Sequence, residues 1–166
     1  MAYTVGQLIA TINPVTVFDA DTVRQALKLM DANNFSQLPV INRERKALGI
    51  ITYESILHAL ESFGATFNHM QVEDALNKMR SLDVMDEVKR TFREDDDLFY
   101  LLDDLKESNV VLIVDKEQKL ISLINSYDTT EYFRIRAEDL MYAEDIENML
   151  KEYINAFFTT SEGLDV

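Results

Sequence analysis

The chain contains no cysteine and no tryptophan, and it has only two prolines and four glycines among 166 residues. Without cysteine it can form no disulfide framework, thiol nucleophile or cysteine zinc site. Its longest apolar runs span about five residues, as at 110–114, whereas a transmembrane helix needs about 20. The first residues also lack the basic segment and apolar stretch of a secretory signal. We therefore expect a cytoplasmic protein without a membrane span.

Basic residues are scarce as well. The 16 lysines and arginines face 30 acidic residues, which gives a net charge of −14. A surface of this sign repels the phosphates of DNA and RNA, so we expect no nucleic-acid partner. His58 and His69 lie eleven residues apart and lack the spacing of a helical zinc pair. We interpret both as surface or packing residues and predict no metal site.

An internal repeat organises the chain, because one segment recurs at an offset of 73 residues. Each copy reads as a Val- and Ile-rich strand, a short polar turn, a second strand and the start of a helix. The matched segments are residues 38–42 with 111–115, 48–51 with 121–124, and 52–55 with 125–128.

A stretch with helical period precedes each predicted hairpin. Its apolar positions are Val23, Ala26, Leu27, Leu29 and Met30 in the first copy, and Leu98, Leu101, Leu102 and Leu105 in the second. Asp21 or Thr22, and one of Asp95, Asp96 and Asp97, supply the helix caps. A unit of about 60 residues buries too little surface alone, so we expect the two copies to share one core. The predicted fold class is α/β (α+β), with two helix-strand-strand-helix repeats and a C-terminal helical extension.

The expected domain organisation follows from these patterns. It comprises a first repeat over 1–60, a helical connector over 61–81, a second repeat over 82–133, a C-terminal helix over 134–158 and a frayed tail over 159–166.

The repeated residues resemble the cystathionine-β-synthase domain, or CBS domain, a family usually found as a tandem pair. The resemblance covers about residues 4 to 133. Its motifs are an opening strand at 5–9 and 13–17, the strand at 38–41, the signature at 49–55, the second opening at 82–85 and the second signature at 122–128.

This resemblance implies a regulatory module that binds AMP, adenosine or another adenine nucleotide in the cleft between the two repeats. In the second signature it implies that Asp128 holds the ribose hydroxyls and that Asn125 contacts phosphate, with Tyr127 between them. In the first signature Thr52 matches, but Ser55 stands where the family has aspartate. This departure puts a complete first site in doubt.

Other candidate ligand contacts follow from the same family pattern. Thr16 and Arg90 precede the first helix of their copies, where the chain wraps the ligand. The adenine slot would be formed by Ser36 and Gln37 in the first copy, with Leu38 beside them, and by Asn109, Val110 and Val111 in the second. Adenine needs an apolar slot with backbone hydrogen bonds, which these segments could supply.

Structural explanations compete with these roles. One carboxylate can accept both ribose hydroxyls, but Asn125 followed by Asp128 also resembles a helix cap with an acidic third residue. Arg90, with Lys89 and Arg93, would equally suit a solvated strand edge. Each residue of the predicted adenine slot could be an ordinary core or strand-edge residue.

The C-terminal helix carries an apolar stripe that includes Tyr153, Phe157 and Phe158. Two interpretations of the stripe are open: it covers the repeats as core, or it is a surface for self-association or for an effector domain or protein. The family resemblance implies a homodimer. The leading hypothesis is a ligand-sensing module, and the alternative is a ligand-free dimerisation or interaction scaffold. No nucleophile, base and orienting group occur at motif spacing, so we predict no catalytic residues.

Overall fold

The computed structural model describes residues 3–62 and 69–162. The chain divides into two compact units, Met1–Ser126 and Tyr127–Val166. Within the described ranges, the first unit holds both β-sheets, and the second consists of a single long helix. No helix in the described part of the chain is both long enough and apolar enough to cross a membrane.

The first repeat contains η1 (Val5–Leu8, a 3₁₀ helix), β1 (Val17–Phe18), α1 (Val23–Asn33), β2 (Gln37–Ile41), β3 (Ala47–Thr52) and α2 (Tyr53–Ser62). The connection and second repeat contain α3 (His69–Lys78), α4 (Ser81–Val84), β4 (Asp86–Glu87), β5 (Thr91–Phe92), α5 (Leu98–Ser108), β6 (Val110–Val114) and β7 (Leu120–Asn125). The last helix is α6 (Ser126–Glu162). One sheet has the order β1-β2-β3-β4 and the other β5-β6-β7.

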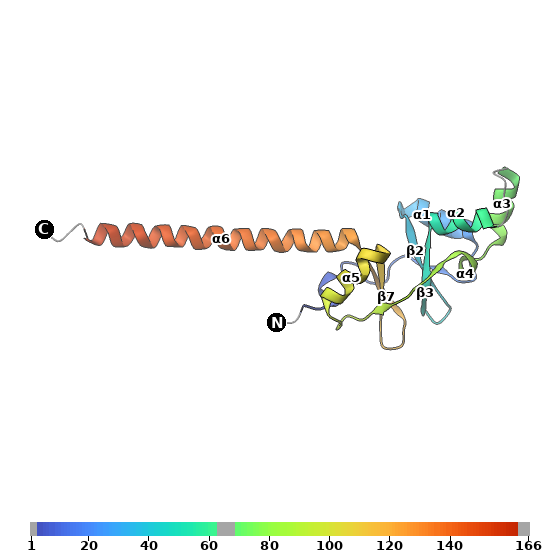
Figure 1. Cartoon of the computed structure of the whole chain (residues 1–166), viewed down its shortest axis with the longest axis horizontal. Helices are drawn as coiled ribbons and strands as arrows, with labels where there is room; N and C mark the ends of the chain where they lie inside the picture. The colour runs from blue at the N-terminus through green and yellow to red at the C-terminus, as the bar shows by residue number, and fades with distance from the viewer. Residues whose placement is uncertain (1–2, 63–68, 163–166) are drawn as a thin grey trace. The chain divides into compact units, whose positions relative to one another are not determined.

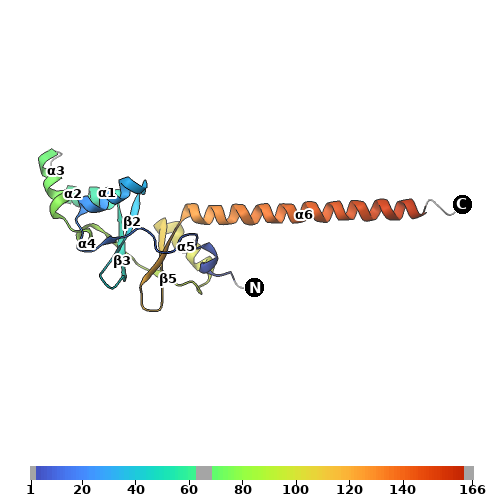
Figure 2. The ribbon, with the colours of Figure 1, turned by 180° about the vertical axis from the view of Figure 1, so that it is seen from behind.

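The two predicted hairpins are confirmed. Strands β2 and β3 pair antiparallel, and so do β6 and β7, with a register irregularity near the same end of each. Asn42 and Asp115 build the turns alike, because the side-chain oxygen of each accepts two backbone N–H groups further along its turn, at 2.8 to 3.0 Å. Figures 1 and 2 show the hairpins side by side from opposite directions.

The helices that precede the hairpins are also confirmed. Thr22 caps α1 by accepting the N–H of Gln25, and Asp97 caps α5 by accepting the N–H of Phe99. The predicted apolar faces are directed into the core, where their buried members are Val23, Ala26, Met30, Leu98, Leu101 and Leu105. Sequence periodicity therefore located both helices and their buried faces.

The repeat has two offsets rather than one. The hairpins recur after 73 residues, from Gln37 to Val110, but the helices recur after 75, from Val23 to Leu98. The first copy therefore has two more residues in the turn between helix and hairpin. Asn34 and Asn109, both left-handed helix caps, occupy equivalent positions in the two copies.

The two repeats exchange their entry segments. Strand β4, which leads into the second repeat, pairs with β3 of the first repeat, with Glu87 opposite Gly49. The segment that leads into the first repeat lies on β7 of the second, where the N–H of Asn13 donates to the carbonyl of Ile121 at 2.9 Å. At one edge of each sheet, the hydrogen-bonded neighbour is therefore the segment that leads into the other repeat.

Gly49 allows the close approach of the chain around β4 to β3. A Cβ atom at this position would lie 2.5 Å from the backbone oxygen of Asp86 and 2.6 Å from the sulfur of Met85. The equivalent residue in the second repeat is the buried Ser122, whose hydroxyl donates to the carbonyl of Thr11 at 2.6 Å. Glycine therefore leaves room for the neighbouring backbone at position 49, whereas the serine at position 122 hydrogen-bonds its neighbouring segment.

The larger buried cluster lies within residues 17–84, and the part of the core that both repeats share is a smaller apolar cluster. Its buried members are Ile41 and Ile50 from the first repeat and Val110, Leu112 and Leu120 from the second. These side chains are at most 9% exposed, so the burial of their apolar surface holds the two sheets together.

Three sequence predictions differ from the structure. Residues 5–8 form a 3₁₀ helix rather than the start of a strand, because their backbone bonds to the second repeat through Val5 and Gly6 instead of to a neighbouring strand. The second opening at 82–85 is largely the short helix α4. Helix α6 runs without interruption across the boundary expected at 133/134 and into the expected tail as far as Glu162, since no glycine or proline interrupts it.

Candidate functional site

The predicted ligand residues of each repeat gather at the end of its hairpin that lies away from the turn. In the first repeat, Gln37 is paired with Thr52, and Ser36 directly precedes the strand. In the second repeat, Val110 is paired with Asn125 in the same way. The sheet pairing therefore brings each predicted adenine segment next to the first residue of its signature.

In the first repeat, Thr52 and Ser55 cap helix α2. The Thr52 N–H donates to the Ser55 hydroxyl oxygen at 2.9 Å, and the Ser55 N–H donates to the Thr52 hydroxyl oxygen at 3.0 Å. The buried Ser55 hydroxyl in turn donates to the Thr52 carbonyl at 3.0 Å. This reciprocal bonding is a capping box, in which the Ser55 hydroxyl both accepts and donates and the Thr52 hydroxyl accepts one backbone N–H.

In the second repeat, the signature spans the junction between strand and helix. Asn125 ends β7 and is half-buried, while Tyr127 and Asp128 lie in the first turn of α6, with Tyr127 exposed and Asp128 half-buried. Thr16 is half-buried just before β1, and Asn109 occupies the left-handed cap of α5.

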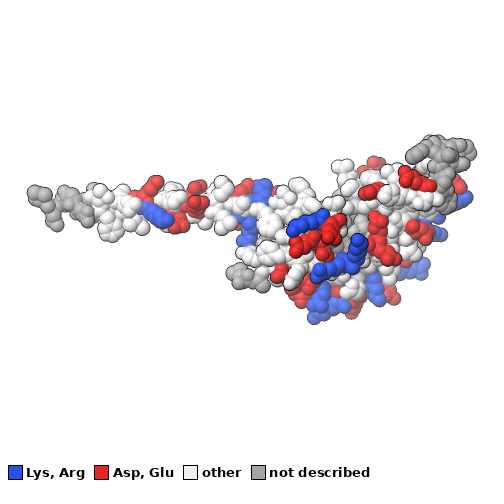
Figure 3. Space-filling view, viewed as in Figure 1, with Lys and Arg blue, Asp and Glu red and all other residues white. Residues whose placement is uncertain are grey.

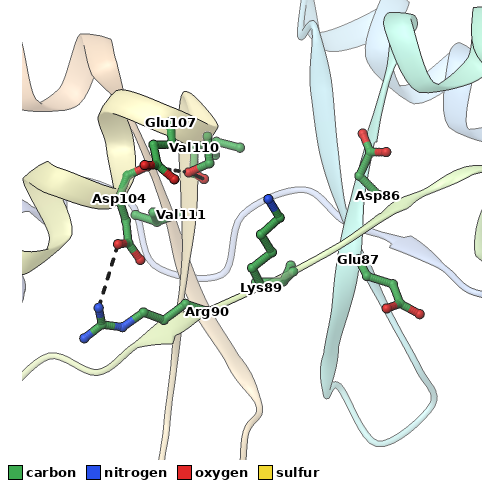
Figure 4. A pocket seen from close by; sticks show the side chains of 10 residues that line it. Asp86, Glu87, Lys89, Arg90, Asp104, Glu107, Val110 and Val111 are labelled. Carbon is green, nitrogen blue, oxygen red and sulfur yellow. Dashed lines mark hydrogen bonds and ion pairs between the residues drawn. The ribbon is translucent and has the colours of Figure 1, made fainter.

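A cavity of about 710 Å³ lies at the boundary between the repeats. The cavity takes its lining from β4, from the segment that follows it, from the end of α5 and from the start of β6. Strand β4 belongs to the first sheet and β6 to the second, so both repeats shape this space. Its lining residues are Asp86, Glu87, Val88, Lys89, Arg90, Asp104, Glu107, Ser108, Val110 and Val111 (Figure 4).

Six of the ten residues that line this cavity carry a charge. Four carboxylates and two cations line it, and the guanidinium of Arg90 lies 3.7 Å from the carboxylate of Asp104. The same guanidinium lies 4.6 Å from the ring centroid of Phe92, a cation–π contact that holds the side chain against the sheet. Figure 4 shows Lys89 between the two groups of acids. The excess of carboxylates disfavours a ligand with several negative charges.

Of the predicted site residues, Arg90, Val110 and Val111 line this cavity. The other predicted site residues in the described part of the first unit do not line the cavity; these are Thr16, Ser36, Gln37, Thr52, Asn109 and Asn125. The sequence analysis missed the four acids of the wall. Asp104 and Glu107 lie one helical turn apart on α5, but acids at this spacing are typical of any solvated helix face, so no local signal marks them.

Comparison with known proteins bears on this site. The family model of the CBS domain matches residues 5–62. The chain carries a CBS domain. Its first unit has the fold of CBS domain pairs, and the second copy, which that match does not span, is the structural repeat of the first.

Two curated relatives share about 30% of their aligned residues with this chain. The uncharacterized protein MJ1225 of Methanocaldococcus jannaschii is 31% identical over 122 residues, which are 69% of this chain and 43% of that protein. Inosine-5'-monophosphate dehydrogenase of Aquifex aeolicus is 30% identical over 118 residues, 70% of this chain and 22% of the enzyme. The chain therefore spans less than half the length of either relative.

Solved CBS structures agree with the fold. The crystal structure of MJ1225 superposes with a TM-score of 0.65 at 28% identity, covering 78% of this chain and 49% of that one. CbpB in complex with c-di-AMP superposes with a TM-score of 0.70 at 15% identity, covering 86% of this chain and 91% of CbpB. CBSX2 in complex with AMP superposes with a TM-score of 0.63 at 24% identity, covering 82% of this chain and 97% of CBSX2.

Proposed function

We propose that this chain is a cytoplasmic regulatory module that binds adenosine or a singly phosphorylated adenosine between its two CBS repeats. The observation that carries this proposal is the cavity of about 710 Å³ whose wall is built from both repeats. Its volume lies within the range of about 300 to 1,000 Å³ typical of small-molecule sites. The AMP and c-di-AMP complexes of CBSX2 and CbpB support an adenine ligand.

The charges around the cavity favour the smaller adenine compounds. Lys89 and Arg90 could neutralise one phosphate, but Arg90 is already near Asp104, and the four acids would repel a second and third phosphate. Adenosine brings no charge, so it avoids this cost. We therefore expect affinity to fall in the order adenosine or AMP, then ADP, then ATP.

We assign the contacts as follows. Val110 and Val111 form an apolar wall for the base, and Arg90 faces the phosphate. Asp128 accepts the ribose hydroxyls, since one ionised carboxylate can accept both. The remaining candidates, which flank these positions in sequence, are Thr16, Ser36, Gln37, Thr52, Asn109, Asn125 and Tyr127.

Regulation follows if the ligand binds one packing of the two repeats better than another, because a ligand shifts an equilibrium only by its differential affinity. The module would then act on an effector without catalysing a reaction itself. The alternative function is a ligand-free interaction scaffold, which the exposed apolar side chains of α6 favour.

Thermal melts test the proposal. A ligand at 100 times its Kd that binds only the folded state adds about 2.7 kcal/mol, which raises the Tm of a chain of this size by roughly 5 to 10 °C. We expect such a rise with adenosine or AMP, a smaller one with ADP, and none with ATP; S-adenosylmethionine and c-di-AMP complete the panel.

Three variants locate the site. Asp128→Asn retains a side chain that can cap a helix but loses the charge, so it should remove the ligand-induced rise while leaving the ligand-free Tm nearly unchanged. Arg90→Gln should weaken AMP and leave adenosine unaffected, whereas Arg43→Gln, at an exposed hairpin turn, should change neither. If no adenine compound raises the Tm of the parent protein, the scaffold alternative replaces the sensor.

A further inference from the structure

Helix α6 carries a continuous apolar stripe over residues 142–157. Its side chains follow one another at helical spacing, and each is between 57% and 72% exposed: Tyr142, Ile146, Met149, Leu150, Tyr153 and Phe157. Figure 3 shows white side chains interspersed with acidic and basic ones along this helix. Monomeric proteins rarely expose apolar surface of this extent, so the stripe indicates a contact surface.

The charges beside the stripe have a regular order. If Ile146 and Tyr153 are placed at the a positions of a heptad, Tyr142 and Met149 fall at d, and Leu150 and Phe157 fall at e. Three acids recur every seven residues along the other flank, at the g positions: Glu138, Asp145 and Glu152. One flank of the stripe is thus apolar and the other is acidic.

This asymmetry distinguishes the two ways in which two copies of the helix could pair. In a parallel pair the g residues of one helix lie beside the e residues of the other, so Asp145 meets Leu150 and Glu152 meets Phe157. In an antiparallel pair g residues lie beside g residues, so acids would face acids across the contact. Like charges in such positions are destabilising.

We propose that α6 pairs with α6 of a second copy of this chain, parallel and in register, through the stripe at 142–157. The area is sufficient: six side chains of this size, each more than half exposed, offer on the order of 800 Å² per helix, which is about what one partner contributes to a standard interface. Tyrosine, phenylalanine and methionine are also the residue types enriched at such contacts.

Salt provides a distinctive signature of this pairing. The two helices bring acidic outer faces near each other, and only Lys151, already paired with Glu147 at 2.7 Å, offers a cation in the stretch 138–157. Because salt screens repulsion between exposed charges, the dimer should tighten as the salt concentration rises. A basic partner helix would show the opposite dependence.

Sedimentation equilibrium of the full chain tests the pairing, at low and high NaCl. We expect a dimer whose Kd falls several-fold from low to high salt. The double variant I146E/Y153E should raise that Kd by at least about 100-fold, because two apolar anchors per helix are lost and charges replace them. The control N148E/N155E adds the same charges on the opposite face of the helix and should leave the dimer intact.

Cysteine crosslinking tests the orientation, since the chain has no cysteine of its own. With parallel pairing in register, Tyr142→Cys faces its own copy and should form an interchain disulfide under mild oxidation. Asn148→Cys, on the polar face, should not. In an antiparallel pair the two residues 142 would lie about 20 Å apart, so Tyr142→Cys would remain reduced.

Three results would overturn the proposal: a chain that is monomeric at every salt concentration, a dimer that survives I146E/Y153E, or a dimer in which Tyr142→Cys fails to crosslink. None of these measurements uses an adenine ligand. The α6 contact and the ligand site can therefore fail separately.

Discussion

Lys46 and Lys119 lie opposite each other in an antiparallel bridge that joins the turns of the two hairpins. The N–H groups of Ala47 and Leu120 each donate to a carbonyl of the other turn, at 3.2 and 2.9 Å. Lysine faces lysine here because both are the same position of the repeat, 73 residues apart. A local pseudo-twofold axis therefore passes between the two side chains.

The facing lysines predict that a charge swap will stabilise the contact. Like charges directly opposite on paired strands repel, although Glu117 lies 2.5 Å from Lys119 and raises the pKa of its ammonium group. In E117K/K119E the ion pair within the turn is kept, and Glu replaces Lys opposite Lys46. We expect a slightly higher Tm for E117K/K119E and a lower one for K119E alone, where two acids adjoin. A lower Tm for the double variant would contradict this account.

Gly49→Ala should destabilise the protein by about 1–3 kcal/mol, the usual cost of forcing an atom into packed structure. The reason is the backbone oxygen of Asp86, 2.5 Å from the position of the added Cβ. Denaturant unfolding measures the loss. Adding Met85→Ala should not restore stability, because it removes the nearby sulfur and leaves the backbone in place. A full rescue would show that the side chain is the obstacle.

Ser55 offers a test of the cap and of the incomplete first signature together. Ser55→Ala removes the group that accepts the Thr52 N–H and should cost about 0.5–2 kcal/mol in unfolding experiments. Ser55→Asp keeps an acceptor for the Thr52 N–H but loses the hydroxyl that donates to the Thr52 carbonyl, so it should recover only part of the stability lost in Ser55→Ala. It also installs the carboxylate that the second signature has at Asp128, and we expect calorimetry to show added adenosine binding relative to the parent. An aspartate variant no more stable than the alanine variant would contradict the capping role.

The pKa of the Glu131 carboxyl should lie below its ordinary value of 4.5, chiefly because Arg134 donates a hydrogen bond to it. A lowered pKa means that the folded chain favours the ionised form. The pair therefore contributes fully above about pH 4.5, and its contribution is lost as the pH falls through the lowered pKa. Carboxyl-detected NMR titration should show this shift, and Arg134→Gln should return the pKa toward 4.5. An unchanged titration in the variant would remove Arg134 as the cause.

Local patterns explain which parts of the fold were predictable. Runs of valine and isoleucine bounded by polar turns located both hairpins. The observed N-caps of α1 and α5, Thr22 and Asp97, were among the capping residues that the sequence predicted. The difference between offsets of 73 and 75 was missed because a turn after a helix can gain residues without changing either neighbour's pattern. Strand β4, at two residues, is too short to leave any pattern.

The candidate site was less predictable than the fold. Arg90, Val110 and Val111 were found through the family resemblance and line the cavity together, but its acidic wall was not foreseen. Asp86 joins that wall because β4 crosses to the first sheet, a long-range pairing that no local spacing encodes. Charged residues on helix ends and linkers carry the same sequence signature whether they face solvent or a cavity.

The exchange of entry segments makes the two repeats a single cooperative folding unit. Neither sheet is complete while the other repeat is unfolded, since β4 edges the first and the chain near Asn13 edges the second. Unfolding of either repeat removes backbone hydrogen bonds from the edge strand of the other. A small molecule that contacts only one repeat would therefore raise the free energy of unfolding of both repeats together.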